Sequence, residues 1–254
     1  MSHLNALAYR QSKALLYLCL YSNDLDTTAL GLTILPEASE AAKQEVMDKI
    51  LQLRNSDGIV QVYFDESRPR LGEISVNELL NYFITILPDP VVCVNVLTLF
   101  YHYNRGHELS ETLAWVKNVL IHRAYLSGTS YYAIPECFLY FLSRLIISVP
   151  EVSKSLRSAF RYAIRERFGA PGDALALAMR IIAAANVGLS DDVDLPTLLS
   201  LQEIDGRFTG YFYRYGASGL LVGNDGVTTA LAQQAIKSIK NVPHSPSQVS
   251  LSLD

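Results

Sequence analysis

Residues 22–35, SNDLDTTALGLTIL, combine two acids and two hydroxyl side chains at the start of an apolar segment. Asp24 and Asp26 lie two positions apart, and Thr27 and Thr28 follow directly. Asp and Thr are good N-cap residues before an apolar helix, but capping alone does not require Asp26. Burial and a second nearby carboxylate both raise the pKa of an Asp, so a close pair can keep one proton. The stretch therefore suits a helix cap or a general acid.

The overall composition is that of an ordinary globular protein. The chain has 254 residues, of which half are hydrophobic and 18% are charged, and its net charge is −4. The sequence contains no block of Lys and Arg residues, so we do not expect it to bind nucleic acid. Cys19, Cys93 and Cys137 are far apart inside apolar runs, which favours reduced thiols and a cytoplasmic protein. No apolar run reaches the roughly 18–20 residues of a transmembrane helix, so none is expected.

Two kinds of helical segment alternate along the chain. One kind is apolar or small on most faces, which predicts a buried helix. These segments are DTTALGLTIL from Asp26, DPVVCVNVLTLF from Asp89, YYAIPECFLYFL from Tyr131, GDALALAMRIIAAA from Gly172 and GVTTALAQQAI from Gly226. Between them lie amphipathic segments such as EASEAAKQEVMDKILQLR and SVNELLNYFITIL. We predict an all-α fold, and one solution is an α/α barrel with inner and outer rings; an α-solenoid or an irregular bundle is the alternative.

A barrel would bring the beginnings of its inner helices to one end. Asp24 and Asp26 would then lie at one mouth, near Asp89, Tyr131, Asp173 and Asp225. We expect a single domain over residues 1–240, followed by a polar, flexible tail at 241–254.

A second repeat is the Asp-Gly pair that follows two amphipathic segments. LQLRNSDGIVQVYF (51–64) and LQEIDGRFTGYF (201–212) share a Gln, an Asp-Gly suited to a tight turn, and an aromatic ending. The second copy, Q-x-x-D-G-x-F, resembles the repeat of the terpene cyclase and prenyltransferase α/α-barrel superfamily. Asp24-Leu25-Asp26-Thr27-Thr28 resembles the D-x-D-T-T form of the class II motif in drimane-type sesquiterpene cyclases.

The resemblance implies the catalytic residues. A class II cyclase protonates a carbon–carbon double bond, a very weak base, and so needs a carboxylic acid that is kept protonated. By resemblance, Asp26 is the proton donor and Asp24 its partner. Thr27 and Thr28 can donate hydrogen bonds to the carboxylate left behind. The expected product is a bicyclic drimane-type diphosphate made from farnesyl diphosphate, which a separate phosphatase would convert to the alcohol.

The rest of the site must hold a hydrocarbon chain and a diphosphate. Aromatic faces can stabilise a carbocation, and cations or Mg²⁺ can bind the diphosphate. We expect Mg²⁺ to be held mainly through the substrate, with no dedicated metal ligands in the protein. The candidate substrate-binding residues are Arg214, Arg70, Tyr131, Tyr132, Tyr211, Tyr213, Tyr215 and Asn224.

Two other functions compete with cyclisation. Only 23 residues precede Asp24, and five buried segments are present where this superfamily's barrel has six, so the ring is complete only if residues 4–21 supply the sixth. An incomplete barrel favours an inactive protein that binds a prenyl chain or a protein partner. D-x-D-x-T is also the nucleophile signature of haloacid-dehalogenase-like phosphatases, but that fold needs alternating strands and helices, which the chain does not supply.

Overall fold

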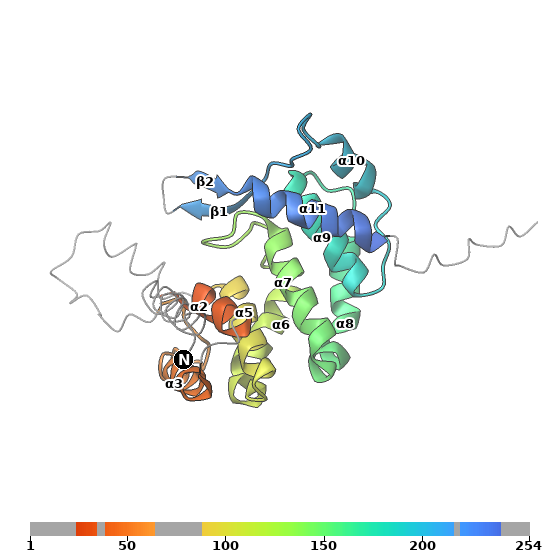
Figure 1. Cartoon of the computed structure of the whole chain (residues 1–254). Helices are drawn as coiled ribbons and strands as arrows, with labels where there is room; N and C mark the ends of the chain where they lie inside the picture. Colours follow the sequence, from red (N-terminus) through yellow and green to blue (C-terminus); the bar gives the residue numbers. More distant parts are fainter. Residues whose placement is uncertain (1–23, 35–38, 64–87, 216–218, 240–254) are drawn as a thin grey trace, which may run out of the picture. The chain divides into compact units, whose positions relative to one another are not determined.

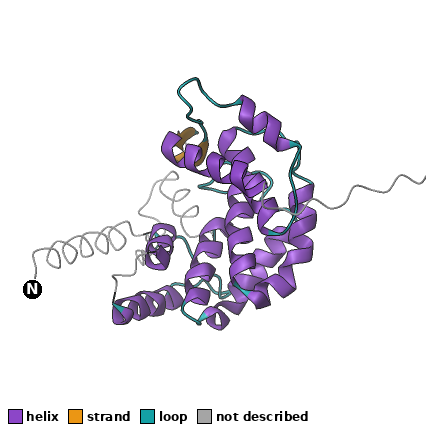
Figure 2. Cartoon of the chain, turned by 45° about the vertical axis from the view of Figure 1, so that its right-hand side comes forward, coloured by secondary structure: helices purple, strands orange, loops and turns teal. Residues whose placement is uncertain are grey.

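The structure is a computed structural model that describes residues 24–34, 39–63, 88–215 and 219–239. Helices predominate in this part of the chain, beside one short two-stranded sheet (Figure 2). This confirms the predicted all-α class, whereas the barrel stays a prediction. The contacts divide the chain into two compact units, Met1–Tyr125 and Leu126–Asp254, which are described separately. Arg70, residues 4–21, the predicted helix at 75–87 and the tail 241–254 lie outside the described residues.

The first unit is built around α5, an almost fully buried helix. The described elements of this unit are α2 (Leu25–Ile34), α3 (Glu40–Gln52), α5 (Pro90–His102), the 3₁₀ turn η1 (Gly106–Leu109) and α6 (Ser110–Ile121) (Figure 1). Asp89 caps α5 by accepting from the backbone N–H of Val91 at 2.8 Å, and Pro90 suits the first helical position. Both α2 and α6 pack against α5, as the predicted buried segment from Asp89 requires.

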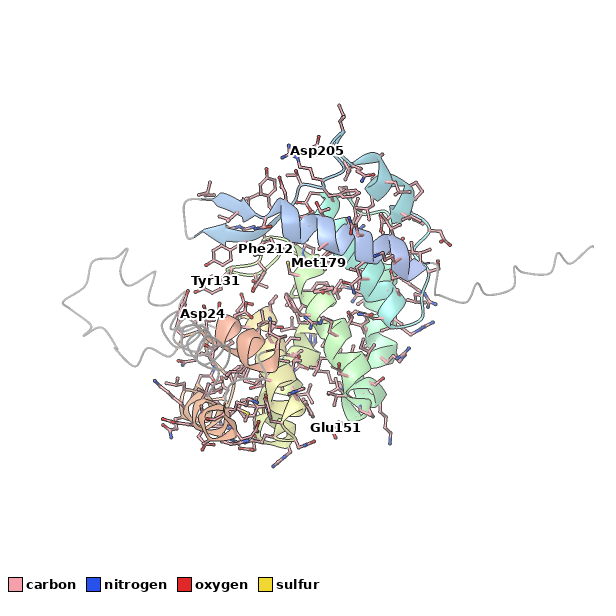
Figure 3. The ribbon with its side chains drawn as sticks, in the orientation of Figure 1. Asp24, Tyr131, Glu151, Met179, Asp205 and Phe212 are labelled. Carbon is pink, nitrogen blue, oxygen red and sulfur yellow. The ribbon has the colours of Figure 1, made fainter. Side chains whose placement is uncertain are left out.

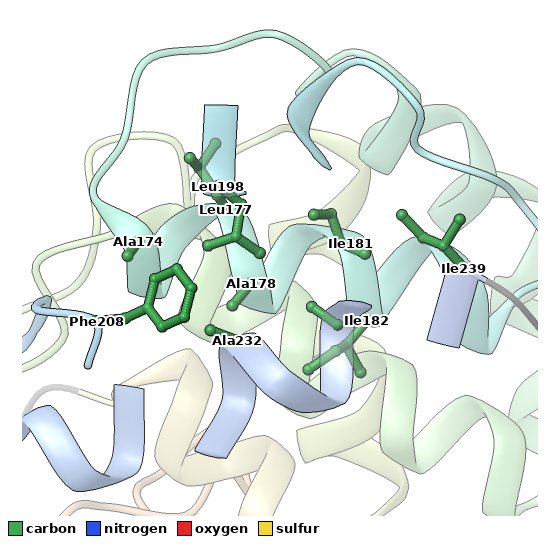
Figure 4. Close-up of a cluster of buried hydrophobic side chains, with 10 residues drawn as sticks. Ala174, Leu177, Ala178, Ile181, Ile182, Leu198, Phe208, Ala232 and Ile239 are labelled. Carbon is green, nitrogen blue, oxygen red and sulfur yellow. The ribbon is translucent and has the colours of Figure 1, made fainter. Parts of the chain in front are cut away.

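The second unit is built around α9, which is buried along almost its whole length. Its helices are α7 (Pro135–Ser148), α8 (Pro150–Arg165), α9 (Ala174–Asn186), α10 (Asp194–Ser200) and α11 (Asp225–Ile239). The strands β1 (Tyr211–Tyr215) and β2 (Leu220–Gly223) pair antiparallel. The other four helices all contact α9, and Figure 4 shows buried side chains of α9, α10 and α11 in one cluster, with Phe208 at one end beside Ala174 and Ala232.

Two expectations about this unit were wrong, and one strand was not predicted. The helix predicted from Tyr131 begins at Pro135, because proline is well suited to a first helical turn. Residues 211–215 form a strand whose Tyr213 bridges Tyr132, and the sequence analysis predicted no strand there. The segment from Gly226 was expected to be buried on most faces, yet α11 buries one face only, made of Thr228, Ala232, Ala235 and Ile239.

The two Asp-Gly repeats form similar returns within their own units. Gly58 and Gly206 both have positive φ, 76° and 87°, which glycine adopts without strain. After the first turn the chain comes back to the start of α2, where Leu25 N–H donates to Val62 O at 2.8 Å. After the second it comes back to the start of α9, where Tyr211 N–H donates to the Asp173 carboxylate at 2.8 Å. Each Asp-Gly loop therefore ties the end of one helix, α3 or α10, to the beginning of another, α2 or α9.

A buried ionic cluster joins α7, α9 and α10. Arg180 has no exposed surface and pairs with Glu136 and Asp194, each at 2.9 Å. Arg167 also pairs with Glu136 at 2.9 Å. Asp191 is buried beside Asp194, whose backbone N–H it accepts at 3.1 Å. The sequence analysis did not anticipate this cluster.

We expect Asp191 to make stability depend on pH. Burial, together with the neighbouring Asp194 carboxylate, raises the pKa of Asp191 from 3.8 to about 7. The folded state therefore holds a proton that the unfolded state has lost, so stability falls as pH rises from about 4 to about 7. Asp191→Asn removes the ionisable group. The difference in melting temperature between this variant and the unaltered chain should therefore increase from about pH 4 to about pH 7 and stay constant above about pH 7. Equal pH profiles of the two proteins in thermal melts would contradict this assignment.

Candidate active site

The first turn of α2 contains the two acids and two threonines singled out above (Figure 3, where Asp24 is labelled). The Asp24 carboxylate accepts from the backbone N–H of Thr27 at 2.8 Å, and the Thr28 hydroxyl donates to the Asp24 carbonyl at 2.8 Å. These bonds form an N-cap. The predicted hydrogen bond from Thr28 to the carboxylate left after proton transfer stays a prediction.

The same cap recurs at α11 with an amide in place of the acid. Asn224 accepts from the backbone N–H of Val227 at 3.0 Å, and the Thr228 hydroxyl donates to the Asn224 carbonyl at 3.1 Å. Two positions after this cap the residue is Gly226, where α2 has Asp26. Asn224, a predicted substrate-binding residue, therefore uses its side-chain oxygen to start a helix.

Two further helices begin with an Asp cap, and they too lack an acid two positions after the cap. Asp89 caps α5 and Asp173 caps α9. Two positions after them the residues are Val91 and Leu175. A side-chain cap in this fold therefore works without an acid two positions later, and capping does not account for Asp26.

Asp26 is instead bonded to a buried amide on α5. The side-chain N–H of Asn95 donates to Oδ1 of Asp26 at 2.6 Å, and Asn95 is 3% exposed. The contact is possible because α2 packs along α5. An amide fixes the orientation of a carboxyl group without adding a positive charge, whereas a Lys or Arg in its place would strongly favour the ionised form. The arrangement holds the Asp26 carboxyl group in a fixed orientation against α5.

Sequence reasoning missed Asn95. It was counted only as part of the buried segment DPVVCVNVLTLF. A signal was available, because an amide among seven or more apolar neighbours must find a hydrogen-bond partner when it is buried. The partner, 69 positions away, follows from the packing of α2 on α5 and not from local sequence.

Several predicted aromatic residues come together in the second unit. The rings of Tyr131 and Tyr213 stack with centroids 6.1 Å apart, and Tyr132 meets Tyr213 edge-on at 6.5 Å. Backbone bonds hold the segment against β1: Arg214 N–H donates to Tyr131 O at 2.7 Å, and Ala133 N–H donates to Phe212 O at 3.2 Å. Figure 3 shows Tyr131 beside β1, the strand that contains Phe212.

The other predicted binding residues are placed as follows. Tyr211 is exposed at the start of β1, and Arg214 is half-buried in the same strand. The side chain of Tyr215 and the whole of Arg70 lie outside what the structure describes. Asp26 belongs to the first unit and the tyrosines to the second, so the shared mouth stays a prediction.

The described residues contain neither a candidate metal-binding group nor a candidate membrane-spanning helix. No group of three His, Cys, Asp or Glu side chains in the described ranges is placed to hold a metal ion. None of the described helices combines the length and apolarity that crossing a membrane requires.

Comparisons with known proteins add independent information. Residues 2–86, which include the start of α2, match the model of the sesquiterpene cyclase astC-like C-terminal domain. Over 219 residues, 85% of its length, the chain is 42% identical to drimenol cyclase drtB of Aspergillus calidoustus. These similarities support a terpene cyclase. The chain spans 38% of that relative's length, and no solved structure matches it.

Proposed function

We propose that this chain is a class II terpene cyclase that converts farnesyl diphosphate to a bicyclic drimane-type diphosphate. The observation that carries the proposal is the Asn95–Asp26 hydrogen bond at 2.6 Å, made by an acid that helix capping does not require. The similarity to a protein named drimenol cyclase supports the drimane skeleton.

Asp26 is the general acid of this proposal. The π electrons of the terminal double bond take its proton to form a C–H bond, which leaves Asp26 as a carboxylate and the substrate as a carbocation. Asp24, which caps α2, is the partner acid of this proposal, because a second carboxylate close by disfavours ionisation of the first. The N–H groups of the first turn and the Asn95 amide then stabilise the carboxylate once the proton has left.

The substrate's remaining double bonds close the rings, and the last cation loses a proton from carbon or takes up water. In our proposal the faces of Tyr131 and Tyr213 stabilise the passing positive charge, and Arg214 and Arg70 contact the diphosphate. Mg²⁺ would be held mainly by the substrate oxygens, since magnesium is commonly bound through substrate phosphates. Protonation occurs at the far end of the chain, so the C–O bond to the diphosphate is not broken.

The product is therefore expected to keep its diphosphate. The chain is incubated with farnesyl diphosphate and Mg²⁺, free diphosphate is assayed during turnover, and products are analysed by gas chromatography with and without added phosphatase. A cyclic alcohol should be detected only after phosphatase treatment, with no diphosphate released in step with cyclisation. Cyclic alcohol without phosphatase would contradict the mechanism, and farnesol alone after phosphatase would favour the prenyl-binding alternative.

A further inference from the structure

The outward face of α8 concentrates positive charge in a chain whose net charge is negative. Within Pro150–Arg165 there are four basic residues and a single acid, Glu151. The basic residues are Lys154, Arg157, Arg161 and Arg165, spaced three, four and four positions apart. Side chains at this spacing share one side of a helix, here over about 16 Å. We call these four residues the α8 basic stripe.

The opposite side of α8 is committed to the core of its unit. Val152, Leu156, Phe160 and Ile164 are fully buried, and α8 contacts α7 and α9. In Figure 3 Glu151, in the first turn of α8, lies at the end of the unit opposite the loop that holds Asp205. Packing therefore fixes the rotation of α8: Lys154 and Arg165 are exposed, whereas Arg157 and Arg161 are half-buried at the edge of this core.

The stripe lacks the anionic partners that other basic residues of the chain have. Among the described residues, Lys154, Arg157 and Arg165 make no ion pair or side-chain hydrogen bond, whereas Arg105 and Arg180 each pair with two acids. Arg161 donates to the carbonyl oxygens of Val187 and Gly188 at the end of α9.

The positive charges of the stripe also affect the pKa of Arg161. Burial, and then the positive charges of Arg165 and Arg157, lower the pKa of Arg161. Like charges held this close repel one another, and an external anion would relieve the repulsion.

We propose that the α8 basic stripe is a docking surface for the phosphate-bearing surface of an anionic membrane. Lys154 and Arg165 are exposed on long flexible stems, and these can adapt to a plane of headgroups without a shaped pocket. Tyr162 is 60% exposed beside the stripe, and the amphipathic Tyr ring suits the headgroup layer. A protein partner is less well matched, because a stable interface needs an apolar centre that the stripe does not offer. This inference goes beyond the proposed cyclisation and does not depend on it.

The test compares two variants that remove the same charge. Lys154→Gln/Arg157→Gln/Arg165→Gln neutralises the stripe but keeps Arg161 and its bonds to the end of α9. Lys49→Gln/Lys117→Gln/Lys237→Gln removes three exposed lysines elsewhere. Gln has nearly the helix propensity of Lys and Arg, so both variants should fold, which circular dichroism checks.

Binding is measured by co-sedimentation with vesicles of phosphatidylcholine, alone or mixed with phosphatidylserine. We expect the unaltered chain to bind only the mixed vesicles and to be released at about 1 M salt, where the Debye length is about 3 Å. Each basic residue near an anionic surface contributes about 1 kcal/mol, so the stripe variant should bind about 100-fold more weakly. The lysine variant should stay close to the unaltered chain.

Three outcomes would overturn the proposal. Equal weakening of both variants would show an effect of net charge alone. Equal binding to both kinds of vesicle would show that headgroup charge is not recognised. Binding of the chain to polyglutamate or RNA, but not to mixed vesicles, would assign the stripe to an acidic protein or a nucleic acid. Free inorganic phosphate in the vesicle assay should compete only at concentrations that also screen charge; release at lower concentrations would indicate a site for a soluble phosphate.

Discussion

Asp26→Asn is expected to lower the rate of farnesyl diphosphate cyclisation by about 10²- to 10⁴-fold, the scale of losing a general acid. Asn has nearly the shape of Asp and can still meet Asn95, but an amide has no acidic proton to transfer. Helix formation should be unaffected, because the residue two positions after a cap is Val91, Leu175 or Gly226 elsewhere in the chain. Turnover is followed by gas chromatography after phosphatase treatment, and substrate affinity by calorimetry. Binding should remain close to that of the unaltered chain.

Asp24→Asn is the matched control for this experiment. Asn224 caps α11 with the geometry that Asp24 has at α2, so an Asn at position 24 should keep the helix intact. In our proposal Asp24 only assists Asp26 and does not transfer the proton itself, so activity should fall far less than in Asp26→Asn. If Asp26→Asn kept near-normal turnover, or if Asp24→Asn were the more damaging of the two, the proton donor would have been assigned to the wrong carboxylate.

The helical class and several helix starts could be predicted from the sequence, because they rest on local patterns. Asp89-Pro90 and Asp173 begin helices as expected, since a capping side chain needs only the next few N–H groups. Pro135 was an equally local signal, but it was overlooked inside the apolar run from Tyr131. Polar residues such as Gln233 and Gln234 in α11 likewise indicated an exposed face that the sequence analysis did not use.

The partners of buried polar groups could not be predicted, because they depend on which helices pack together. Asp26 was recognised by its motif, yet Asn95 on α5 emerges only from the packing of α2 on α5. Arg180 lies inside the apolar run ALALAMRIIAAAN, and its acidic partners are 44 and 14 positions away. Sequence alone indicated neither pairing, although a polar residue in a buried helix always requires one.

The buried ionic cluster of the second unit should dominate its stability. Arg180→Met is expected to reduce the free energy of unfolding by about 3–5 kcal/mol, because it leaves Asp194, and partly Glu136, buried without the neutralising cation. Arg207→Met is the control in the same unit. Arg207 is 54% exposed and pairs with Asp205 and Asp225 at 3.5 and 3.4 Å, so its loss should cost less than about 1 kcal/mol. Both values are measured by urea unfolding followed by circular dichroism.

Charge compensation can be separated from packing by adding Glu136→Gln and Asp194→Asn to Arg180→Met. The combined variant removes the uncompensated charges while keeping side chains of similar size, so it should be more stable than Arg180→Met alone. A combined variant no more stable than Arg180→Met would mean that Arg180 stabilises the unit through the volume it fills between α7, α9 and α10, and not through its charge.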